Sequence, residues 1–307
     1  MNDKNSHQFA AESGAMRLLR RLGQHSLAWS VRRLHVPVPD SALVLEVGSG
    51  GNPYFRSNVL IDAYEETRER HNVPLVADRP TVLGYVENLP FRDKVFDFVI
   101  ASHVLEHSAD PKRFLTELER VAKAGYIEVP DALMERLNPY LDHRLEITER
   151  DGRLVIRKKK AWRADPELVE LYERGANKVI AGMAIPKHPF EFHVRYYWND
   201  QINYEIVNAA DDANWPAPAA NFAPRKSTLR ARLQATVLGA IRRLFSQKKR
   251  NCALDIVALL QCPECRKGRL SREAGLLRCW TCQASFEVRN DIPRLFPSAK
   301  RDGINEP

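Results

Sequence analysis

The first 251 residues contain no cysteine, and the chain has no long hydrophobic run. No apolar stretch approaches the roughly 18 residues that are needed to cross a bilayer. The polar start, residues 1–5, lacks the charged-then-apolar order of a secretion signal. Since all five cysteines lie at or after position 252, a disulfide-bonded secreted domain is also excluded. We therefore expect a cytoplasmic protein without a transmembrane segment.

Acidic residues are absent between positions 225 and 250, where nine lysines and arginines occur. The net charge of the whole chain is +8, so the excess positive charge belongs to this one segment rather than to a generally nucleic-acid-coating surface. The segment predicts an amphipathic helix that packs on its own domain, lies on an anionic membrane or binds RNA phosphate, in that order of preference. Its apolar face would carry Leu229, Leu233, Val237, Ile241 and Leu244.

Length and composition predict two folded units. With 307 residues and 44% hydrophobic content, the chain can fill the core of one α/β domain and still form a small module. Prolines at positions 216, 218 and 224 block a helix in an alanine-rich stretch and so indicate a linker. We predict a large domain over residues 1–207, the linker and basic helix over 208–250, and a small domain over 251–307.

A glycine turn between two apolar strands is the most informative pattern. Residues 44–53 read Val-Leu-Glu-Val-Gly-Ser-Gly-Gly-Asn-Pro, and residues 60–62 form a second apolar strand that ends on Asp62. In an open α/β sheet a ligand lies across the carboxyl ends of such strands, with its polar end on glycine backbone and its ribose hydroxyls on the acid. The pattern therefore predicts a nucleoside site. Only a turn fits between Gly50 and Val59, where a helix is usual.

The remaining apolar patterns predict a doubly wound, mostly parallel sheet with an antiparallel edge hairpin. An almost continuous apolar run over 95–102 is typical of a strand buried on both faces. We also expect an opening helix over 16–34 that is interrupted near Gly23 and packs Trp29 on the sheet. The other expected elements are helices over 111–123 and 166–183, a strand over 125–129, a hairpin of 143–148 with 154–157 around Asp151-Gly152, and an antiparallel pair of 190–198 with 202–206.

Two further motifs give the chain a family resemblance. Leu89-Pro90-Phe91 is followed by residues 96–107, which contain Phe-Asp and end in Val-Leu-Glu-His. In order and spacing, residues 42–131 resemble the class I S-adenosylmethionine-dependent methyltransferases, closest to the large group with an LPF…FDxVxxxxVLEH signature. The resemblance implies an enzyme that uses S-adenosylmethionine. Its implied cofactor residues are Glu46, Gly48, Gly50 and Asp62, with glycine backbone on the methionine moiety and Asp62 on the ribose.

The adenine end departs from the family pattern. Tyr85 occupies the position where the family has an acid that meets adenine. We expect the backbone of Val86 and Glu87 to hold adenine instead, with Tyr85 stacking on it. Ser102, at the end of a predicted strand, completes the expected cofactor contacts.

Polar residues just past strand ends are the catalytic candidates, because ligands lie outside carboxyl ends. Methyl transfer is an in-line displacement, so it needs positioning, and it needs a base only where the acceptor must lose a proton. These criteria select His103 and Asp131. Residues 103–107 also fit the H-x-x-E-H pattern of zinc proteases, which we reject because the motif follows a buried strand. We expect Glu106 and His107 to cap or pack.

Two Cys-x-x-Cys pairs carry the sharpest chemistry in the sequence. They lie thirteen residues apart, and two such turns place four thiolates around one tetrahedral zinc. With no open position, this zinc should be structural, with Trp280 and Phe286 covering it. Cys252 is expected to be a small buried side chain. Residues 253–296 resemble the small zinc-ribbon family whose members stabilise or activate methyltransferases, including those acting on tRNA and proteins. The predicted ligands are Cys262, Cys265, Cys279 and Cys282.

We predict methyl transfer to a small molecule, a lipid-linked sugar or a surface-glycan precursor. Methylation of a base carbon needs a cysteine nucleophile, which the large domain lacks, and the Asn/Asp-Pro-Pro-aromatic run of many amino-group methylating enzymes is also missing. Transfer to RNA ribose or guanine is the first alternative, and a cofactor-binding adaptor without turnover is the second. Peripheral membrane contact through residues 225–250 would be compatible with a lipid-linked acceptor.

Overall fold

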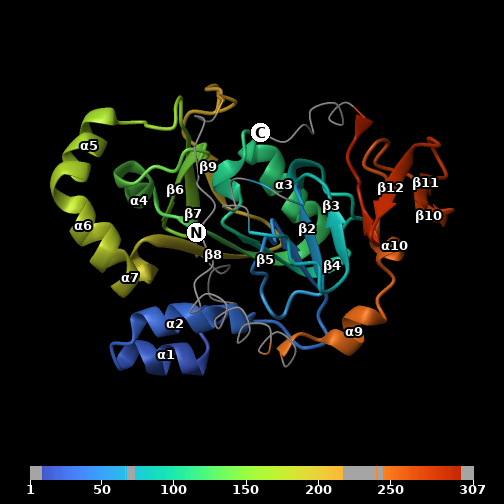
Figure 1. Cartoon of the computed structure of the whole chain (residues 1–307), viewed down its shortest axis with the longest axis horizontal. Helices are drawn as coiled ribbons and strands as arrows, with labels where there is room; N and C mark the ends of the chain where they lie inside the picture. The colour runs from blue at the N-terminus through green and yellow to red at the C-terminus, as the bar shows by residue number, and fades with distance from the viewer. Residues whose placement is uncertain (1–8, 66, 68–72, 217–239, 241–244, 299–307) are drawn as a thin grey trace. The chain divides into compact units, whose positions relative to one another are not determined.

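A computed structural model of the chain describes residues 9–65, 67, 73–216, 240 and 245–298 (Figure 1). Most of the predicted basic helix over 225–250 lies outside these residues. The chain divides into two compact units. Unit 1 comprises residues 1–39, 101–115 and 124–220, and unit 2 comprises residues 40–100, 116–123 and 221–307.

Six strands follow the hydrogen-bonded order β3-β2-β1-β4-β5-β8. β1 pairs with β2 and β2 pairs with β3 in parallel, whereas β8 is antiparallel to β5. The prediction of a mixed α/β fold with a mostly parallel sheet is therefore confirmed. The strands are β1 (Val44–Val47), β2 (Val59–Asp62), β3 (Thr81–Leu83), β4 (Phe96–Ser102), β5 (Ala122–Pro130) and β8 (His193–Asn199).

In unit 2 the apolar strands β1 and β2 are buried along their whole length. A turn rather than a helix joins them, as the short spacing predicted. Asn58 closes this turn, because its Oδ1 accepts a hydrogen bond of 2.9 Å from the Val44 N–H. The parallel register, which places Val47 opposite Ile61, brings the strand ends next to Gly48 and Asp62 close together.

In unit 1 the predicted opening helix is broken as expected. α1 (Gly14–Arg21) and α2 (His25–Val31) are separated at Gly23, whose φ of 71° favours glycine. Trp29 of α2 contacts the ring of His193 in β8, with ring centroids 4.6 Å apart. The predicted packing of Trp29 on a sheet strand is confirmed.

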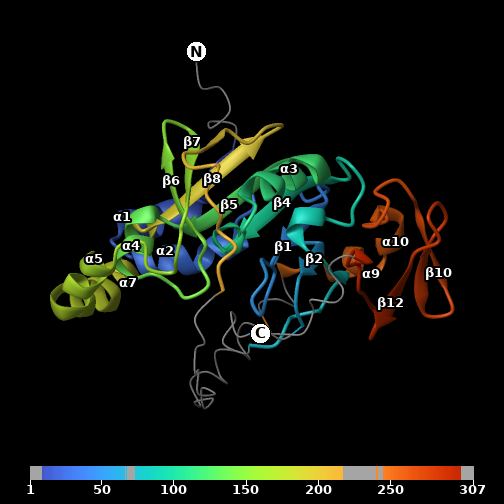
Figure 2. The ribbon, with the colours of Figure 1, turned by 90° about the horizontal axis from the view of Figure 1, so that it is seen from above.

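A second sheet in unit 1 has the order β6-β7-β9. β6 (Leu145–Arg150) and β7 (Arg153–Lys158) form the predicted hairpin, with positive φ at Asp151 and Gly152 (Figure 2). The predicted pairing of 190–198 with 202–206 is wrong, because β9 (Tyr204–Ile206) runs parallel to β7 while β8 alone forms the antiparallel edge. The Leu154 N–H binds the carbonyl of Asn203 at 2.9 Å and so holds this segment beside β7.

Helical segments complete unit 1. The predicted helix over 166–183 is present as α and π turns that continue to Lys187. No helix in the described part of the chain is both long and apolar enough to cross a membrane. The segments are α4 (Ala132–Leu137), α5 (Pro166–Leu171), a π turn (Tyr172–Ala176), α6 (Asn177–Val179), a π turn (Ile180–Ala184), α7 (Ile185–Lys187), and 3-10 turns at Arg32–Leu34, Leu105–His107 and Pro189–Glu191; α3 (Pro111–Val121) has residues in both units.

The C-terminal module belongs to unit 2, together with β1, β2 and β3. Its antiparallel sheet has the order β10-β11-β12-β13, and its last segment continues along β3, where the Leu295 N–H binds the Leu83 carbonyl at 2.8 Å. One parallel bridge, between Leu83 and Arg294, thus joins this segment to the edge strand β3. Its elements are α9 (Lys248–Cys252), α10 (Ile256–Leu259), β10 (Leu270–Glu273), β11 (Leu276–Cys279), β12 (Ser285–Arg289) and β13 (Ile292–Pro293), and the 3-10 turn Val86–Asn88 follows β3.

Candidate functional site

The glycine turn in unit 2 has the backbone that its sequence predicts. Gly48 and Gly50 have φ values of 60° and 56°, in the left-handed region that favours glycine. Between them, Ser49 is buried, and none of the described residues forms a hydrogen bond with its Oγ. A buried hydroxyl without a partner is costly unless a ligand binds it. Our sequence analysis missed Ser49, although a serine between two such glycines was a visible signal.

Asp62 faces the same turn. Its Oδ2 accepts a hydrogen bond of 2.9 Å from the Gly50 N–H, and its Oδ1 accepts one of 3.1 Å from the Tyr64 N–H. A carboxylate is purely an acceptor, which suits it to the donating hydroxyl groups of a ribose. The chemistry of the turn therefore fits the polar and ribose parts of S-adenosylmethionine, with contact by Asp62 as a prediction.

Glu46 stabilises the loop that follows the glycine turn through hydrogen bonds. Its buried carboxylate accepts hydrogen bonds from the Tyr54 N–H, at 2.8 Å, and from the Ser57 hydroxyl. Gly51 shapes the loop as well, because a Cβ there would lie 2.4 Å from Val73 Cγ1. The structure thus gives Glu46 a supporting place, and its direct contact with cofactor stays a prediction.

The predicted adenine residues follow β3. The rings of Tyr85 and Phe296 meet edge to face, with centroids 5.0 Å apart. Burial, and then the charge of Glu87, raise the pKa of Tyr85, so its phenol stays neutral at pH 7. Val86 and Glu87 lie in the 3-10 turn directly after Tyr85. The C-terminal module therefore contacts the ring that we expect to stack on adenine.

In unit 1, three side chains donate hydrogen bonds to the buried carboxylate of Glu128 in β5. It accepts hydrogen bonds from Arg32 at 2.7 Å, Tyr126 at 2.6 Å and Ser102 at 2.9 Å. Burial acts to raise the pKa of Glu128, but Arg32 and then His103 outweigh it and hold this pKa well below its ordinary value. Our sequence analysis missed Glu128, although a carboxylate inside an apolar strand is a signal of a buried ionic site.

His103 lies between two carboxylates. Its Nδ1 is 3.4 Å from Glu106 Oε1, and its Nε2 is 3.4 Å from Glu128 Oε1. Burial acts to lower the pKa of His103, but the two carboxylates outweigh it and raise the pKa to about 9. The ring is therefore an imidazolium at neutral pH. Its backbone is fixed at a φ of 58° by a hydrogen bond from its N–H to the Glu128 carbonyl.

Asp131 has well-defined structural contacts. Its Oδ1 accepts a hydrogen bond from the Leu133 N–H and caps α4, and its Oδ2 accepts one of 2.7 Å from the Thr148 hydroxyl. Ser102 donates its hydroxyl proton to Glu128. Unit 1 thus brings Ser102 and His103 together at Glu128. The side chain of Asp131 instead contacts α4 and β6. The catalytic role of Asp131 stays a prediction.

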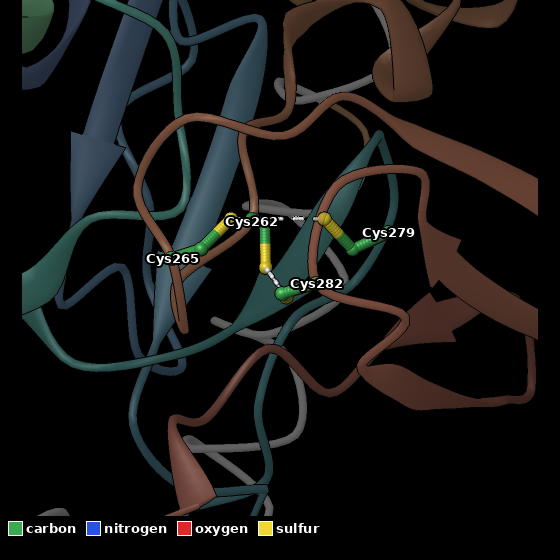
Figure 3. A group of neighbouring side chains, drawn as sticks. All are labelled: Cys262, Cys265, Cys279 and Cys282. Carbon is green, nitrogen blue, oxygen red and sulfur yellow. Dashed lines mark hydrogen bonds between the residues drawn. The ribbon is translucent and has the colours of Figure 1, made fainter.

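The four predicted zinc ligands converge in the C-terminal module (Figure 3). Their sulfur atoms all lie within 4.8 Å of one another, and Cys262 Sγ lies 3.7 Å from Cys282 Sγ. Gly268 lies against them, because a Cβ there would be 2.1 Å from Cys279 Sγ. Burial acts to raise the pKa of Cys265, but backbone N–H groups of Lys267 and Gly268 outweigh it and lower the pKa to about 7. A thiolate set of this kind fits zinc.

Two expectations around the cysteines are wrong. Cys252 is exposed rather than buried, because it ends the short surface helix α9. Trp280 is 72% exposed and does not cover the cysteine cluster, whereas Phe286 is buried as expected. Trp280 lies between the two cysteines of the second Cys-x-x-Cys turn.

Several known proteins resemble this chain in part of their sequence or structure. Among the curated proteins, one from Methanocaldococcus jannaschii of uncharacterised function is 28% identical over 81 residues, which are 26% of this chain and 40% of the relative. A chain in a complex containing the Haloferax volcanii Trm112 methyltransferase activator is 17% identical, covers 62% of this chain and 96% of itself, and gives a TM-score of 0.36. The PH0226 protein of Pyrococcus horikoshii is 16% identical, covers 62% of this chain and 93% of its own, and gives a TM-score of 0.33. We draw no conclusion from these low scores.

The family comparison addresses the region around the glycine turn. Residues 45–127, from β1 to β5, match the family model Methyltransf_11, described as a methyltransferase domain. The match includes the glycine turn, Asp62 and the Val-Leu-Glu-His motif, the same features that carry the resemblance in the sequence. Residues 45–127 therefore form a methyltransferase domain, and the match does not extend to the rest of the chain.

Proposed function

We propose that the chain transfers the methyl group of S-adenosylmethionine to a small molecule, a lipid-linked sugar or a surface-glycan precursor. The observation that carries the cofactor part is the bond between Gly50 N–H and the Asp62 carboxylate beside the unsatisfied Ser49 hydroxyl. This arrangement supports binding of a ligand with vicinal hydroxyls and a charged amino-acid end. When bound, S-adenosylmethionine supplies an electrophilic methyl group on a positively charged sulfur.

The protein's own contribution is to hold the acceptor in line with that methyl group. We propose that His103 and Asp131, each directly after a sheet strand, contact the acceptor. Glu128 would act as a positioning residue, because it fixes both Ser102 and His103. The acceptor class rests on the sequence, which lacks a cysteine nucleophile in the large domain and the amino-group motif. We propose a cytoplasmic location for this reaction.

We further propose that the C-terminal module braces the adenine end of the cofactor site. A structural zinc held by the four cysteines would fix the fold of the module without taking part in chemistry. Backbone bonds tie the module to β3 at Leu83 and to the segment between β3 and β4 at Pro90 and Arg92. Since Phe296 also contacts Tyr85, bracing reaches the ring that we expect beside adenine.

The full chain, loaded with zinc, tests this function. Titration calorimetry should show binding of S-adenosylmethionine and of its demethylated product, and labelled methyl groups should appear on lipid-linked sugars. Asp62→Asn should weaken cofactor binding at least tenfold, whereas Asp291→Asn, at an exposed aspartate, should leave it unchanged. Methyl transfer only to total RNA, with steep salt dependence, would replace the glycan acceptor by the RNA alternative. Binding without transfer to any acceptor would favour the adaptor, and no binding would overturn the proposal.

A further inference from the structure

A second group of metal-ligating side chains lies in unit 1, apart from the cysteines. Glu106 and His107 come from the 3-10 turn after β4, and His143 comes from the loop before β6. One ligand atom from each lies within 4.8 Å of the other two. The Arg144 N–H binds the Glu106 carbonyl at 2.7 Å and so ties the loop to the turn.

Glu106 has a carboxylate that its surroundings do not satisfy. The side chain is only 3% exposed, and neither oxygen accepts a hydrogen bond within the described part of the chain. The imidazole of His103 pairs with this carboxylate, with Nδ1 3.4 Å from Oε1. A buried carboxylate with unused lone pairs is strongly unfavourable unless a cation or donor completes it. His103 pairs with Oε1 alone, so Oε2, which has no hydrogen-bond partner among the described residues, can bind a metal ion.

The two histidines carry the partners that metal-bound histidines usually have. His143 Nδ1 lies 2.7 Å from Glu135 Oε2, and Lys159 Nζ holds the other oxygen of Glu135 at 2.6 Å. His107 Nδ1 lies 3.3 Å from Asp142 Oδ2. In metal sites, a carboxylate of this kind orients the imidazole that binds the metal. This observation is independent of the unsatisfied Glu106.

The ring of His143 is also fixed by stacking. Tyr140 lies parallel to it, with centroids 4.7 Å apart and an interplanar angle of 27°. Both Glu135 and Lys159 are buried, so their ion pair is held in one geometry. A pre-oriented imidazole loses little freedom on binding an ion, which favours a site that forms before the metal arrives.

We propose that Glu106, His107 and His143 bind a divalent transition-metal ion. Two imidazoles and one carboxylate suit zinc and its first-row neighbours, whereas magnesium and calcium prefer oxygen ligands alone. Three protein ligands leave a coordination position for water or for an oxygen or sulfur atom of a bound molecule. The four-cysteine cluster has no such position, so the two metals would have different chemistry.

Two of the proposed ligands, Glu106 and His107, are the last two residues of the H-x-x-E-H motif. His103, its first residue, forms ion pairs with Glu106 and Glu128 instead of joining the metal ligands. The third ligand, His143, lies 36 residues after His107 in the sequence. The inference is independent of methyl transfer, because metal binding is measured without turnover.

Metal content of the full chain tests the proposal. After removal of metal and reloading with zinc, the wild type should hold two zinc ions per chain, one at each proposed site. Glu106→Gln and, separately, His107→Gln should each lose one zinc ion and keep the other. Glu167→Gln, at an exposed glutamate of α5, should retain both. One zinc ion in the wild type, or two in both variants, would overturn the proposal.

Cobalt separates the two sites even where a variant is destabilised. Bound to four thiolates, cobalt gives intense sulfur-to-metal charge-transfer bands, whereas nitrogen and oxygen ligands give only weaker visible bands. The wild type should show both sets, and the Glu106→Gln spectrum should lack the nitrogen and oxygen set while its thiolate bands remain. A wild-type spectrum with thiolate bands alone at cobalt saturation would contradict the proposal.

Discussion

Arg32 and Glu128 form a buried, bidentate ion pair although they lie 96 positions apart in the sequence. Arg32 Nε lies 2.7 Å from Oε2 and Nη2 lies 2.7 Å from Oε1. The guanidinium also lies over the Trp29 ring, 3.6 Å from its centroid. Planar arginine suits this fork, and its stacking on Trp29 fixes the orientation. The pair keeps Glu128 ionised beside Ser102 and His103.

The first prediction concerns acid stability. Because the pKa of Glu128 is depressed in the folded chain, its ionised form stabilises the fold at pH values above the ordinary glutamate pKa. That contribution is lost as the pH falls through the folded value. Glu128→Gln should lower the free energy of unfolding by about 3 kcal/mol at pH 7, because it leaves Arg32 buried without its counter-charge. Urea unfolding at pH 7 and at lower pH measures this.

The difference between wild type and Glu128→Gln should narrow only when the pH falls below about 4.5, the ordinary glutamate value. Glu167→Gln serves as control, since it removes an exposed carboxylate and should leave the unfolding midpoint within experimental error. A constant difference across this pH range would contradict the assignment of the effect to ionisation of Glu128.

The second prediction concerns Asp62. Both of its oxygens accept backbone hydrogen bonds, so Asp62→Asn must turn an amide NH2 group toward an N–H group of Gly50 or Tyr64. The substitution should distort the glycine turn and weaken binding of S-adenosylmethionine at least tenfold, or about 1.4 kcal/mol. Calorimetry on the full chain checks this. An unchanged dissociation constant would remove Asp62 from the cofactor site.

The local geometries that the sequence predicted are those whose signal lies within a few residues. Glycines at left-handed φ, an acid that ends a strand and two Cys-x-x-Cys turns all encode their role within a few positions, and Gly48, Gly50 and Cys262 illustrate this. Glu128 and its partner Arg32 were missed because their pairing depends on the tertiary fold. The same holds for the contact of Phe296 with Tyr85.

The error in strand pairing has a similar origin. Alternation in residues 202–206 correctly indicated an extended segment, but its period does not specify the partner strand. The structure pairs β9 with β7 rather than with its neighbour in sequence, β8. A short connection favours a hairpin on average, and the hydrogen bond between Leu154 and Asn203 outweighs that tendency here.

The third prediction concerns Gly268. A methyl group at this position would lie 2.1 Å from Cys279 Sγ, so Gly268→Ala must displace this predicted zinc ligand. We expect loss of the tetrathiolate cobalt spectrum and a lower melting temperature. Gly275→Ala is the matched control in the same module, because a Cβ there meets nothing within 4 Å and only its positive φ is strained. Intact cobalt–thiolate bands in Gly268→Ala would contradict this geometry.

The fourth prediction joins the C-terminal module to cofactor binding. Phe296→Leu keeps an apolar side chain in a buried position but removes the edge-to-face contact with Tyr85. Such aromatic pairs contribute about 1 kcal/mol. If the contact holds the Tyr85 ring in place for adenine, Phe296→Leu should bind S-adenosylmethionine roughly fivefold more weakly than the wild type. Fluorescence or calorimetric titration of the zinc-loaded chain measures the change.

Trp280→Leu is the control for this effect, because Trp280 is an exposed aromatic residue of the same module. It should bind the cofactor like the wild type. Removal of zinc with a chelator should weaken cofactor binding at least as much as Phe296→Leu, since the segment that carries Phe296 follows the metal-bound turns in the same small sheet. If both treatments left cofactor affinity unchanged, the module would contribute stability to β3 but not to the adenine end of the site.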